Sequence, residues 1–331
     1  MNTTEDSAGQ PVGLDVGTSR IVVARNRDNK QHFEAQLNAF VSLPNFRLTE
    51  SLLTEEKVFH EVQGSKIVVA GSDAQRFADM FHVEVRRPMR SGVLNPDEPE
   101  SLAVVQRIIG KLVGPAAKAG QRLSFSVPAP VGGEGDDIAY HEASIRQILT
   151  GLGYQATPIN EGLAVVLGEM AASNYTGIAI SFGSGLCNVC LAALSLPVFT
   201  FSVPKAGDFI DTRAAKAIGE LATRMRTHKE QSFQFNGVSA DRLHNALAVY
   251  YEDVIRSVVD ALVLNCAQRH PKLEHPVPLV LSGGTAMPKG FLEQFDKMLR
   301  GRELPFQISE VRLALDPRYS TARGALVAAH I

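Results

Sequence analysis

The feature that most constrains the fold is a unit that occurs twice: a strand, a turn containing glycine, two further strands and a helix. The strands are expected at residues 12–15, 21–24 and 33–41 in the first copy, and at residues 177–181, 186–194 and 198–203 in the second. The turns between the first two strands are Gly17-Thr18-Ser19 and Phe182-Gly183-Ser184-Gly185. A chain of 331 residues suits two domains or one large one, so we interpret it as two weakly similar halves.

The turns of this unit are candidate phosphate-binding loops. Gly17 has no Cβ, so its backbone can approach an anion closely. Successive N–H groups in such a turn can surround a phosphate, and Asp15 could hold the hydrated metal that accompanies it. An Asp followed by Gly-Thr-Ser also suits an ordinary hairpin turn. Four turns that contain glycine or an acid each follow the carboxyl end of an expected strand, at residues 13–19, 159–164, 181–185 and 281–285. In open sheets, ligands bind at this edge.

Composition narrows the class of protein. A net charge of −2 gives no bulk attraction to nucleic acid or to anionic membrane. Three cysteines cannot form a disulfide framework, and Cys187 and Cys190 fall on opposite faces of an expected strand, so we predict buried free thiols and a cytoplasmic protein. Residues 1–10 lack the basic and apolar parts of a signal peptide, and no run of about 20 apolar residues exists. We therefore expect a disordered leader, no transmembrane segment and no obvious membrane anchor.

Three polar stretches are expected to be irregular and exposed. Residues 44–57 look like an irregular segment, residues 86–90 like a solvated basic loop, and residues 224–236 like a short exposed excursion. A long helix capped by Ser239 is predicted to run to Gln268, and a final helix is predicted over residues 321–330.

Several motifs, in this order, resemble the actin-like ATPase superfamily, which includes actin, bacterial MreB-type proteins and the heat-shock chaperone ATPase domain. Residues 13–18 resemble its first phosphate loop, residues 159–161 the start of its connecting helix, and residues 182–185 its second phosphate loop. Residues 203–211 resemble the segment that follows that loop. Residues 279–287 are similar to its adenosine motif, and residues 316–317 with 321–324 to the MreB-type C-terminal signature. The resemblance covers about residues 11–330.

The resemblance implies an α/β chain with the actin/heat-shock-ATPase-like fold: two duplicated ribonuclease-H-like domains around a nucleotide cleft. Domain I would span residues 11–158, with subdomain IB over about residues 31–95. Domain II would span residues 159–331, with a C-terminal helix over about residues 318–330 that packs back toward domain I. Only about thirty residues separate the segment at Gly207 from the long helix, so subdomain IIB would be small or absent.

The resemblance also assigns roles to residues in the turns. Asp15 would bind Mg²⁺ through water, and Glu161 would orient the water that attacks ATP or another nucleoside triphosphate. The remaining residues would contact the nucleotide: Gly17, Thr18, Ser19, Gly183, Ser184, Gly185, Gly207, Asp208, Gly283, Gly284 and Thr285. Glu161 and Asp208 also have a simpler interpretation, as acids that favour the start of a helix. The motifs do not choose between ATP and GTP.

The departures from the family pattern concern catalysis. Ser181 stands where the second phosphate loop normally has Asp, and Leu186 and Asn188 replace a small hydroxyl residue and an acid. Losing one charged group from such a site costs roughly 10²–10³ in rate. We therefore predict a bacterial actin-like cytoskeletal protein that binds ATP and Mg²⁺, assembles with itself into filaments, binds no nucleic acid directly and hydrolyses slowly. The alternatives are a non-polymerising nucleotide-binding regulator or scaffold, and a small-molecule kinase, for which the chain is short.

Overall fold

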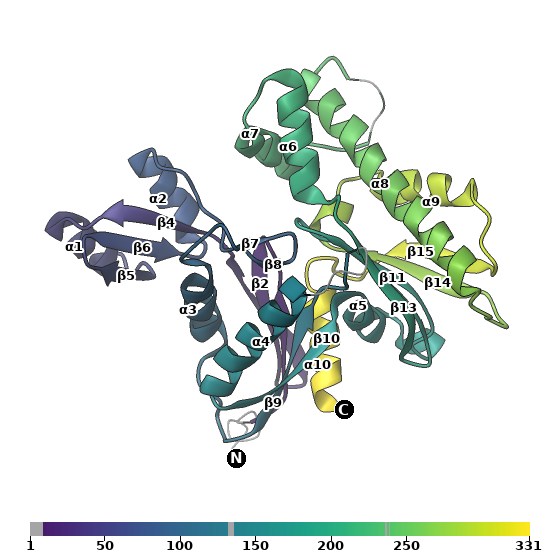
Figure 1. Ribbon diagram of the computed structural model, residues 1–331, viewed down its shortest axis with the longest axis horizontal. Helices are drawn as coiled ribbons and strands as arrows, with labels where there is room; N and C mark the ends of the chain where they lie inside the picture. Colours follow the sequence, from purple (N-terminus) through teal and green to yellow (C-terminus); the bar gives the residue numbers. More distant parts are fainter. Residues whose placement is uncertain (1–8, 132–135, 236, 238) are drawn as a thin grey trace.

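A computed structural model describes residues 9–131, 136–235, 237 and 239–331. Most of the leader predicted to be disordered, residues 1–8, lies outside the described residues. The chain forms two parts, each built on a five-stranded sheet (Figure 1). A cleft lies between them. We call the part built on the first sheet the first half and the part built on the second sheet the second half.

The first sheet has the strand order β10-β9-β1-β2-β3. Strands β1, β2 and β3 are antiparallel neighbours, whereas β9 and β10 run parallel to β1. Their bounds are β1 Val12–Val16, β2 Arg20–Arg27, β3 Lys30–Leu37, β9 Gln121–Val127 and β10 Tyr154–Asn160. The hairpin predicted around Gly17-Thr18-Ser19 is therefore confirmed, and its turn lies at the carboxyl end of β1.

The second sheet repeats this order as β13-β12-β11-β14-β15. Its bounds are β11 Gly177–Phe182, β12 Cys187–Ala193, β13 Leu196–Val203, β14 Val277–Ser282 and β15 Ile308–Leu313. Again three antiparallel strands are followed by two parallel ones, so β11 corresponds to β1 and β14 to β9. The predicted duplication is confirmed at the level of topology. The sequence reasoning missed β15, whose residues are all partly or fully exposed.

Helices cover the outer faces of both sheets and also fill the space between them. The covering helices are α3 Ser101–Val113 and α4 Asp136–Gly151 in the first half, and α6 Gly207–Ile218, α8 Arg242–Arg269 and α9 Phe291–Arg300 in the second. Between the sheets lie α5 Glu161–Glu169 and α10 Ser320–His330, packed against each other (Figure 1). Their contact needs glycine, because a Cβ on Gly324 would lie 1.6 Å from the carbonyl oxygen of Ala164. The predicted final helix is confirmed, and it packs on β1 and β9.

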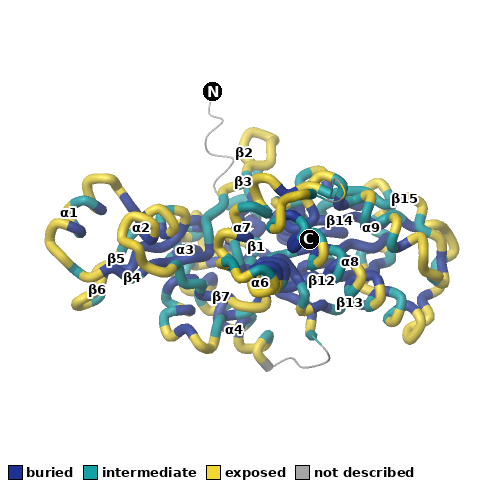
Figure 2. Tube along the Cα trace, turned by 90° about the horizontal axis from the view of Figure 1, so that it is seen from above, coloured by how far each residue is buried: buried dark blue, intermediate teal, exposed yellow. Residues whose placement is uncertain are grey.

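A small lobe projects from the first half with its own apolar core. It contains β4 Phe40–Pro44, α1 Arg47–Glu55, β5 His60–Gln63, β6 Lys66–Ala70 and α2 Asp73–Phe81. Figure 2 shows the lobe extending from the buried centre of the molecule, with α1 largely exposed. The prediction of an irregular segment over residues 44–57 was wrong. Helix α1 is polar because it buries mainly Thr49 and Leu53 and exposes the rest of its surface.

One helix, α7 Ala222–Gln231, connects α6 to α8. The prediction of an exposed excursion over residues 224–236 was wrong, because Met225 and Phe233 are buried against the core of the second half. The expected small subdomain IIB is confirmed: among the described residues, α7 and the segment after it are what joins α6 to α8. The long helix α8 is confirmed as well, although Asp241, rather than Ser239, caps it by accepting from the N–H of Leu243.

Two predictions about composition can be checked against the fold. Cys187, Cys190 and Cys266 are free and buried, which confirms the buried thiols predicted for Cys187 and Cys190. Cys187 and Cys190 belong to different apolar clusters on the two faces of β12. Within the described residues, no helix is long and apolar enough to cross a membrane.

Candidate functional site

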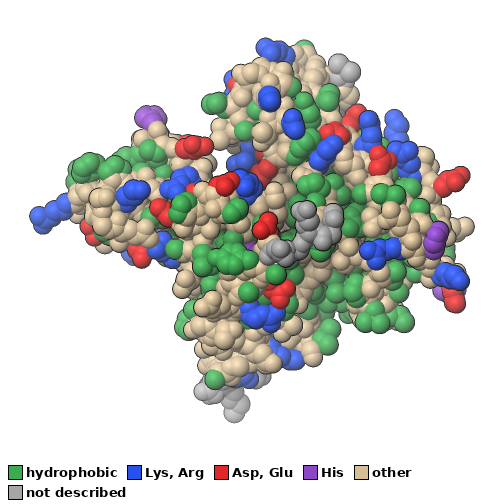
Figure 3. Space-filling view, in the orientation of Figure 1, with side chains coloured by type: hydrophobic (Ala, Val, Ile, Leu, Met, Phe, Trp, Pro, Cys, Tyr) green, Lys and Arg blue, Asp and Glu red, His purple; other side chains and the backbone are tan. Residues whose placement is uncertain are grey.

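The cleft between the halves has a volume of about 610 Å³, within the range of small-molecule sites. In the space-filling view the surface is hollowed between the small lobe and the part formed by α6 and α7, and charged side chains gather there (Figure 3). All but one of the residues assigned by resemblance line this cleft: Asp15, Gly17, Thr18, Ser19, Glu161, Gly183, Ser184, Gly185, Asp208, Gly283, Gly284 and Thr285. Gly207 lies behind them, where its carbonyl oxygen accepts from Lys229 Nζ at 3.0 Å.

Hydrogen bonds to its backbone fix the shape of the first glycine turn, residues 17–19. The N–H of Gly17 donates to the carbonyl oxygen of Arg20 at 3.0 Å. Buried Asn38 contacts both ends of the turn: its Nδ2 donates to the Gly17 carbonyl oxygen at 2.9 Å, and its N–H donates to the Ser19 carbonyl oxygen at 2.8 Å. The sequence reasoning missed Asn38, because this contact depends on the register between β2 and β3.

The second glycine turn, residues 183–185, repeats this geometry. The N–H of Gly183 donates to the carbonyl oxygen of Leu186 at 3.0 Å. The Gly183 carbonyl oxygen accepts from Thr285 Oγ1 at 2.8 Å, which ties this turn to the turn after β14. Ser184 Oγ is buried and has no hydrogen-bond partner among the described residues. Both turns therefore have a fixed backbone shape, and both line the cleft.

The two glycine turns meet where the halves approach each other. A Cβ on Gly185 would lie 2.4 Å from Thr18 Oγ1 and 2.8 Å from the Gly92 nitrogen, so only glycine fits there. The Gly92 N–H donates to Thr18 Oγ1 at 3.0 Å. Gly92 belongs to the hairpin of β7 Met89–Arg90 and β8 Val93–Leu94, which therefore packs against both turns.

Two carboxyl groups lie at the floor of the cleft, that of the half-buried Asp15 and that of the buried Glu161. Asp15 Oδ1 accepts from Ser126 Oγ at 2.8 Å, and Glu161 Oε2 accepts from Asn188 Nδ2 at 2.7 Å. Burial raises the pKa of Asp15 to about 6, against the lowering effect of Ser126. Burial, and then the charge of Asp15, raise the pKa of Glu161 to about 8. Carboxyl groups perturbed in this way and lying in a cleft are candidates for a functional site.

Ser181 brings no charge to this floor. It lies at the end of β11, 5% exposed, and lines the cleft near Glu161 and Asn188. Asp15 and Glu161 are therefore the carboxyl groups that the described residues place on the floor. Among the described residues, no group of three or more His, Cys, Asp or Glu side chains could hold a metal ion by itself.

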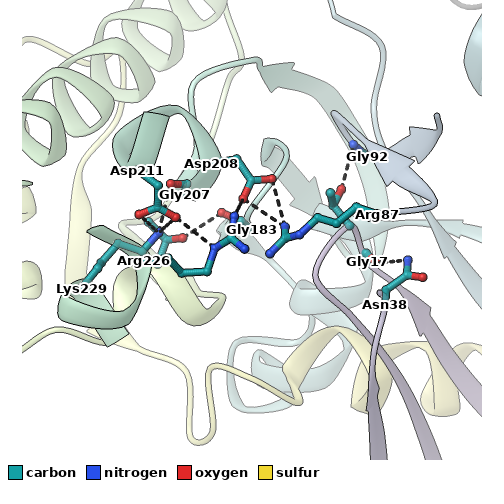
Figure 4. A network of polar contacts seen from close by, with 12 residues as sticks. Gly17, Asn38, Arg87, Gly92, Gly183, Gly207, Asp208, Asp211, Arg226 and Lys229 are labelled. Carbon is teal, nitrogen blue, oxygen red and sulfur yellow. Dashed lines mark hydrogen bonds and ion pairs between the residues drawn. The ribbon is translucent and has the colours of Figure 1, made fainter. Parts of the chain in front are cut away.

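A network of charged residues lines the cleft (Figure 4), and the sequence reasoning missed three of its members, Arg87, Arg226 and Lys229. Arg87 Nη1 reaches from the first half to the Asp208 carboxylate, at 3.1 and 3.3 Å. Arg226 on α7 contacts Asp208 at 3.4 Å and Asp211 at 3.3 Å, and Lys229 lies 2.8 Å from Asp211. Burial lowers the pKa of Arg87, while the charge of Asp208 opposes that change.

These contacts correct the interpretation of residues 86–90 as a solvated loop, because the Arg87 side chain is only 18% exposed. A local signal was present: Arg226 and Lys229 are three residues apart, as are Asp208 and Asp211, which puts each pair on one face of a helix. Sequence spacing does not show that the two faces meet.

The end of α7 and the segment after it form part of the cleft wall. Residues 231–234 line the cleft together with Met287 and Pro288. The N–H of Phe235 donates to the Lys289 carbonyl oxygen at 2.8 Å, and the Phe233 ring stacks on Tyr251 with centroids 4.8 Å apart. These contacts hold the segment against the turn after β14.

Comparisons with known proteins agree with this architecture. A filament of MamK is 19% identical, with a TM-score of 0.75, over 97% of this chain and 98% of that chain. MreB5 of Spiroplasma citri bound to AMPPNP is 12% identical, with a TM-score of 0.67, over 95% and 94%. The ethanolamine utilization protein EutJ from Carboxydothermus hydrogenoformans is 17% identical, with a TM-score of 0.55, over 96% and 88%.

Two duplicated sheets around a shared cleft, together with these matches, define the fold of the actin-like ATPase superfamily. Within that class the chain belongs to the volactin family, whose family model matches residues 11–329. No curated protein matches the chain.

Proposed function

We propose that this protein binds a nucleoside triphosphate, with ATP as the first candidate, together with Mg²⁺ in the cleft, and that it assembles with itself into filaments. The meeting of two equivalent glycine turns at Thr18 and Gly185 is the observation that carries the proposal. Two glycine turns that line one cleft suit a polyphosphate better than a neutral ligand. The buried free thiols suit a cytoplasmic location.

The glycine turns would bind the phosphates. Gly17, Thr18 and Ser19 would contact them from the first half, and Gly183, Ser184 and Gly185 from the second. The unpartnered hydroxyl group of Ser184 supports this assignment, because a buried hydroxyl normally has a hydrogen-bond partner. Gly283, Gly284 and Thr285 would lie beside the nucleoside. The Asp208 carboxylate already pairs with Arg87 and Arg226, so this residue would act mainly by holding those cations in place.

The Asp15 carboxyl group at the floor of the cleft suits Mg²⁺. This ion usually binds one or two carboxylates, substrate phosphates and several waters, so the scarcity of acidic clusters among the described residues is compatible with it. Asp15, oriented by Ser126, would hold it through water. When bound, the ion would neutralise phosphate charge.

Slow hydrolysis is the expected consequence of the floor's chemistry. Glu161 can accept a proton from an attacking water only when it is ionised, and its pKa of about 8 leaves it mainly protonated at neutral pH. Ser181 supplies no charge of its own to this part of the site. A bound triphosphate would therefore be hydrolysed slowly.

Sedimentation and negative-stain microscopy test the proposal. We expect the protein at tens of micromolar to pellet and to show filaments with ATP and Mg²⁺, and not without nucleotide. Titration calorimetry with AMPPNP measures binding separately from assembly. We expect filaments because the fold is similar to that of MamK in a filament. Head-to-tail contacts between copies of one chain can produce such filaments, since they propagate without closing. Absence of both binding and pellets would contradict it.

A second candidate is a nucleotide-binding regulator or scaffold that does not polymerise. Ser181 favours it, because a site that has lost a charged group can keep binding while losing turnover. Clear binding of AMPPNP with no pellet and no phosphate release would select this candidate over the first.

A further inference from the structure

Asn188 lies at the centre of a buried polar network that connects the two halves beside Glu161. Its side chain is 0% exposed on β12. Its Oδ1 accepts from the Ala129 N–H at 2.9 Å, and its Nδ2 donates to Glu161 Oε2 at 2.7 Å. Ala129 follows β9 in the first half, whereas Glu161 begins α5.

The orientation of the Asn188 amide follows from these partners. A backbone N–H can only donate, so the atom that faces Ala129 must be the oxygen. The NH₂ group then faces Glu161, where it favours the ionised carboxylate. Ser202 Oγ lies 2.7 Å from both Asn188 Oδ1 and the Ala129 carbonyl oxygen, which fixes the same edge of the amide from β13.

We propose that Asn188 is a positioning residue that fixes the carboxyl group of Glu161 and ties its orientation to the contact between the halves. The bond to Asn188 occupies Oε2, so Oε1 is the oxygen left for a water in the cleft. Movement of the segment around Ala129 relative to β12 would act on Asn188 and therefore on Glu161. This inference rests on the hydrolysis proposed above.

The family pattern has an acid at this position, and the structure shows what the amide changes. A carboxylate at residue 188 would place two acids at hydrogen-bonding distance in a site where both are buried. Two carboxylates in one site raise a pKa strongly, because both cannot ionise together. The titratable groups whose charges act on Glu161 or respond to it are Asp15 on β1 and Cys187 on β12.

The Asn188→Asp variant of the full chain tests the inference with two measurements. In phosphate release with ATP and Mg²⁺, the rate of the wild type should rise with pH as Glu161 ionises. The variant should move this rise at least about one pH unit higher and lower the rate at pH 7 about tenfold or more. Its affinity for AMPPNP should stay within about threefold of the wild type.

An infrared titration of the carboxyl band gives a second measurement that needs no turnover. The band that disappears in Glu161→Gln identifies Glu161, and its midpoint should also rise by about one pH unit or more in Asn188→Asp. Asn188→Ala, which removes the donor without adding charge, should raise it by less. Asn245→Asp is the matched control: Asn245 Nδ2 donates to the Ser239 carbonyl oxygen at 2.6 Å near the start of α8, so this change should leave the midpoint unchanged.

The outcomes separate this inference from the proposed function. An unchanged midpoint and pH profile in Asn188→Asp would overturn the inference and leave nucleotide binding intact. A rate that falls equally at every pH would indicate a purely structural role and would also overturn it. A wild type that binds AMPPNP but releases no phosphate would overturn the inference, because Asn188 would then have no hydrolysis step to serve. A wild type that binds no nucleotide would overturn the proposed function itself.

Discussion

The hairpin of β1 and β2 and the hairpin of β11 and β12 occupy equivalent places in the two sheets, and the same bond closes both turns. Aligning Gly17 with Gly183 places Asp15 opposite Ser181. In the first hairpin a serine of the neighbouring parallel strand, Ser126, donates to Asp15. In the second hairpin Ser282 has that place in β14, and it instead bonds to the Pro317 carbonyl oxygen and to Ser320.

The difference shows that the backbone of the hairpin can be kept in a half that lacks the carboxyl group. The geometry suited to phosphate is kept in both halves, because it depends on glycine and on main-chain hydrogen bonds. The carboxyl group at the end of the strand is kept in one half only. We therefore expect binding to depend on both hairpins and charge-dependent chemistry to depend on the first.

The largest expected effect is on the hairpin that keeps its acid. Asp15→Ala should weaken Mg²⁺-dependent binding of AMPPNP about 100-fold or more, because the second hairpin has no carboxylate to replace it. Titration calorimetry with and without Mg²⁺ measures the change. An affinity equal to that of the wild type would show that Asp15 in the first hairpin does not contribute to Mg²⁺-dependent binding.

The next effect concerns the stability of the buried acids. The raised pKa of Glu161 means that the native state keeps a proton that the unfolded state has lost between about pH 4.5 and 8. The free energy of unfolding should therefore fall as pH rises, by about 2 kcal/mol between pH 6.5 and 8. Buried His141, whose pKa burial lowers to about 4, is neutral in the native state but about half protonated in the unfolded state at pH 6.5, so it offsets about 0.4 kcal/mol of this fall.

Urea denaturation without nucleotide at several pH values measures this slope. Glu161→Gln should remove most of it, since a glutamine does not titrate. A free energy of unfolding that rises with pH in the wild type, or the same slope in Glu161→Gln, would contradict the assignment of the proton to Glu161.

A smaller effect distinguishes the two turns by shape. Gly185→Ala should destabilise the protein by about 1–3 kcal/mol, because its Cβ would clash with Thr18 Oγ1 and the Gly92 nitrogen. Ser19 is the equivalent residue of the first turn and already has a Cβ, so Ser19→Ala should change stability by less than about 0.5 kcal/mol. Thermal unfolding compares the two variants, and equal effects would show that the turns do not meet as described.

The smallest expected effect restores the missing acid. Ser181→Asp should raise phosphate release about tenfold, less than the full value of such a charge, because the other groups of the site evolved without it. Ser181→Asn, which has a similar volume and no charge, is the control. A flat response in Ser181→Asp would argue that Ser181 does not limit turnover.

Local chemistry explains which parts could be predicted from the sequence. Gly17 and Gly183 are read from one short stretch each, because a turn that binds an anion needs glycine and main-chain groups only. Helix α1 was missed because its buried face contains little more than Thr49 and Leu53.

The contacts that the sequence reasoning missed join residues that are far apart in the sequence. Arg87 meets Asp208 across 121 positions, Asn188 meets Ala129 across 59, and Asn38 meets Gly17 across 21. Nothing in the residues beside each partner indicates these contacts. They depend on how the strands pair and how the halves meet, which a single sequence does not specify locally.

Helix α10 has a consequence for how the chain acquires its structure during synthesis. It covers β2 through Ala322 and Leu326, which pack on Val22 and Ala24, and Tyr319 stacks on Phe33 with ring centroids 4.9 Å apart. The ribosome makes this helix after every strand of both sheets. One face of the earliest strands is therefore not covered until the last helix has been synthesised. Until then the nascent chain presents an uncovered apolar sheet, the kind of surface that chaperones bind.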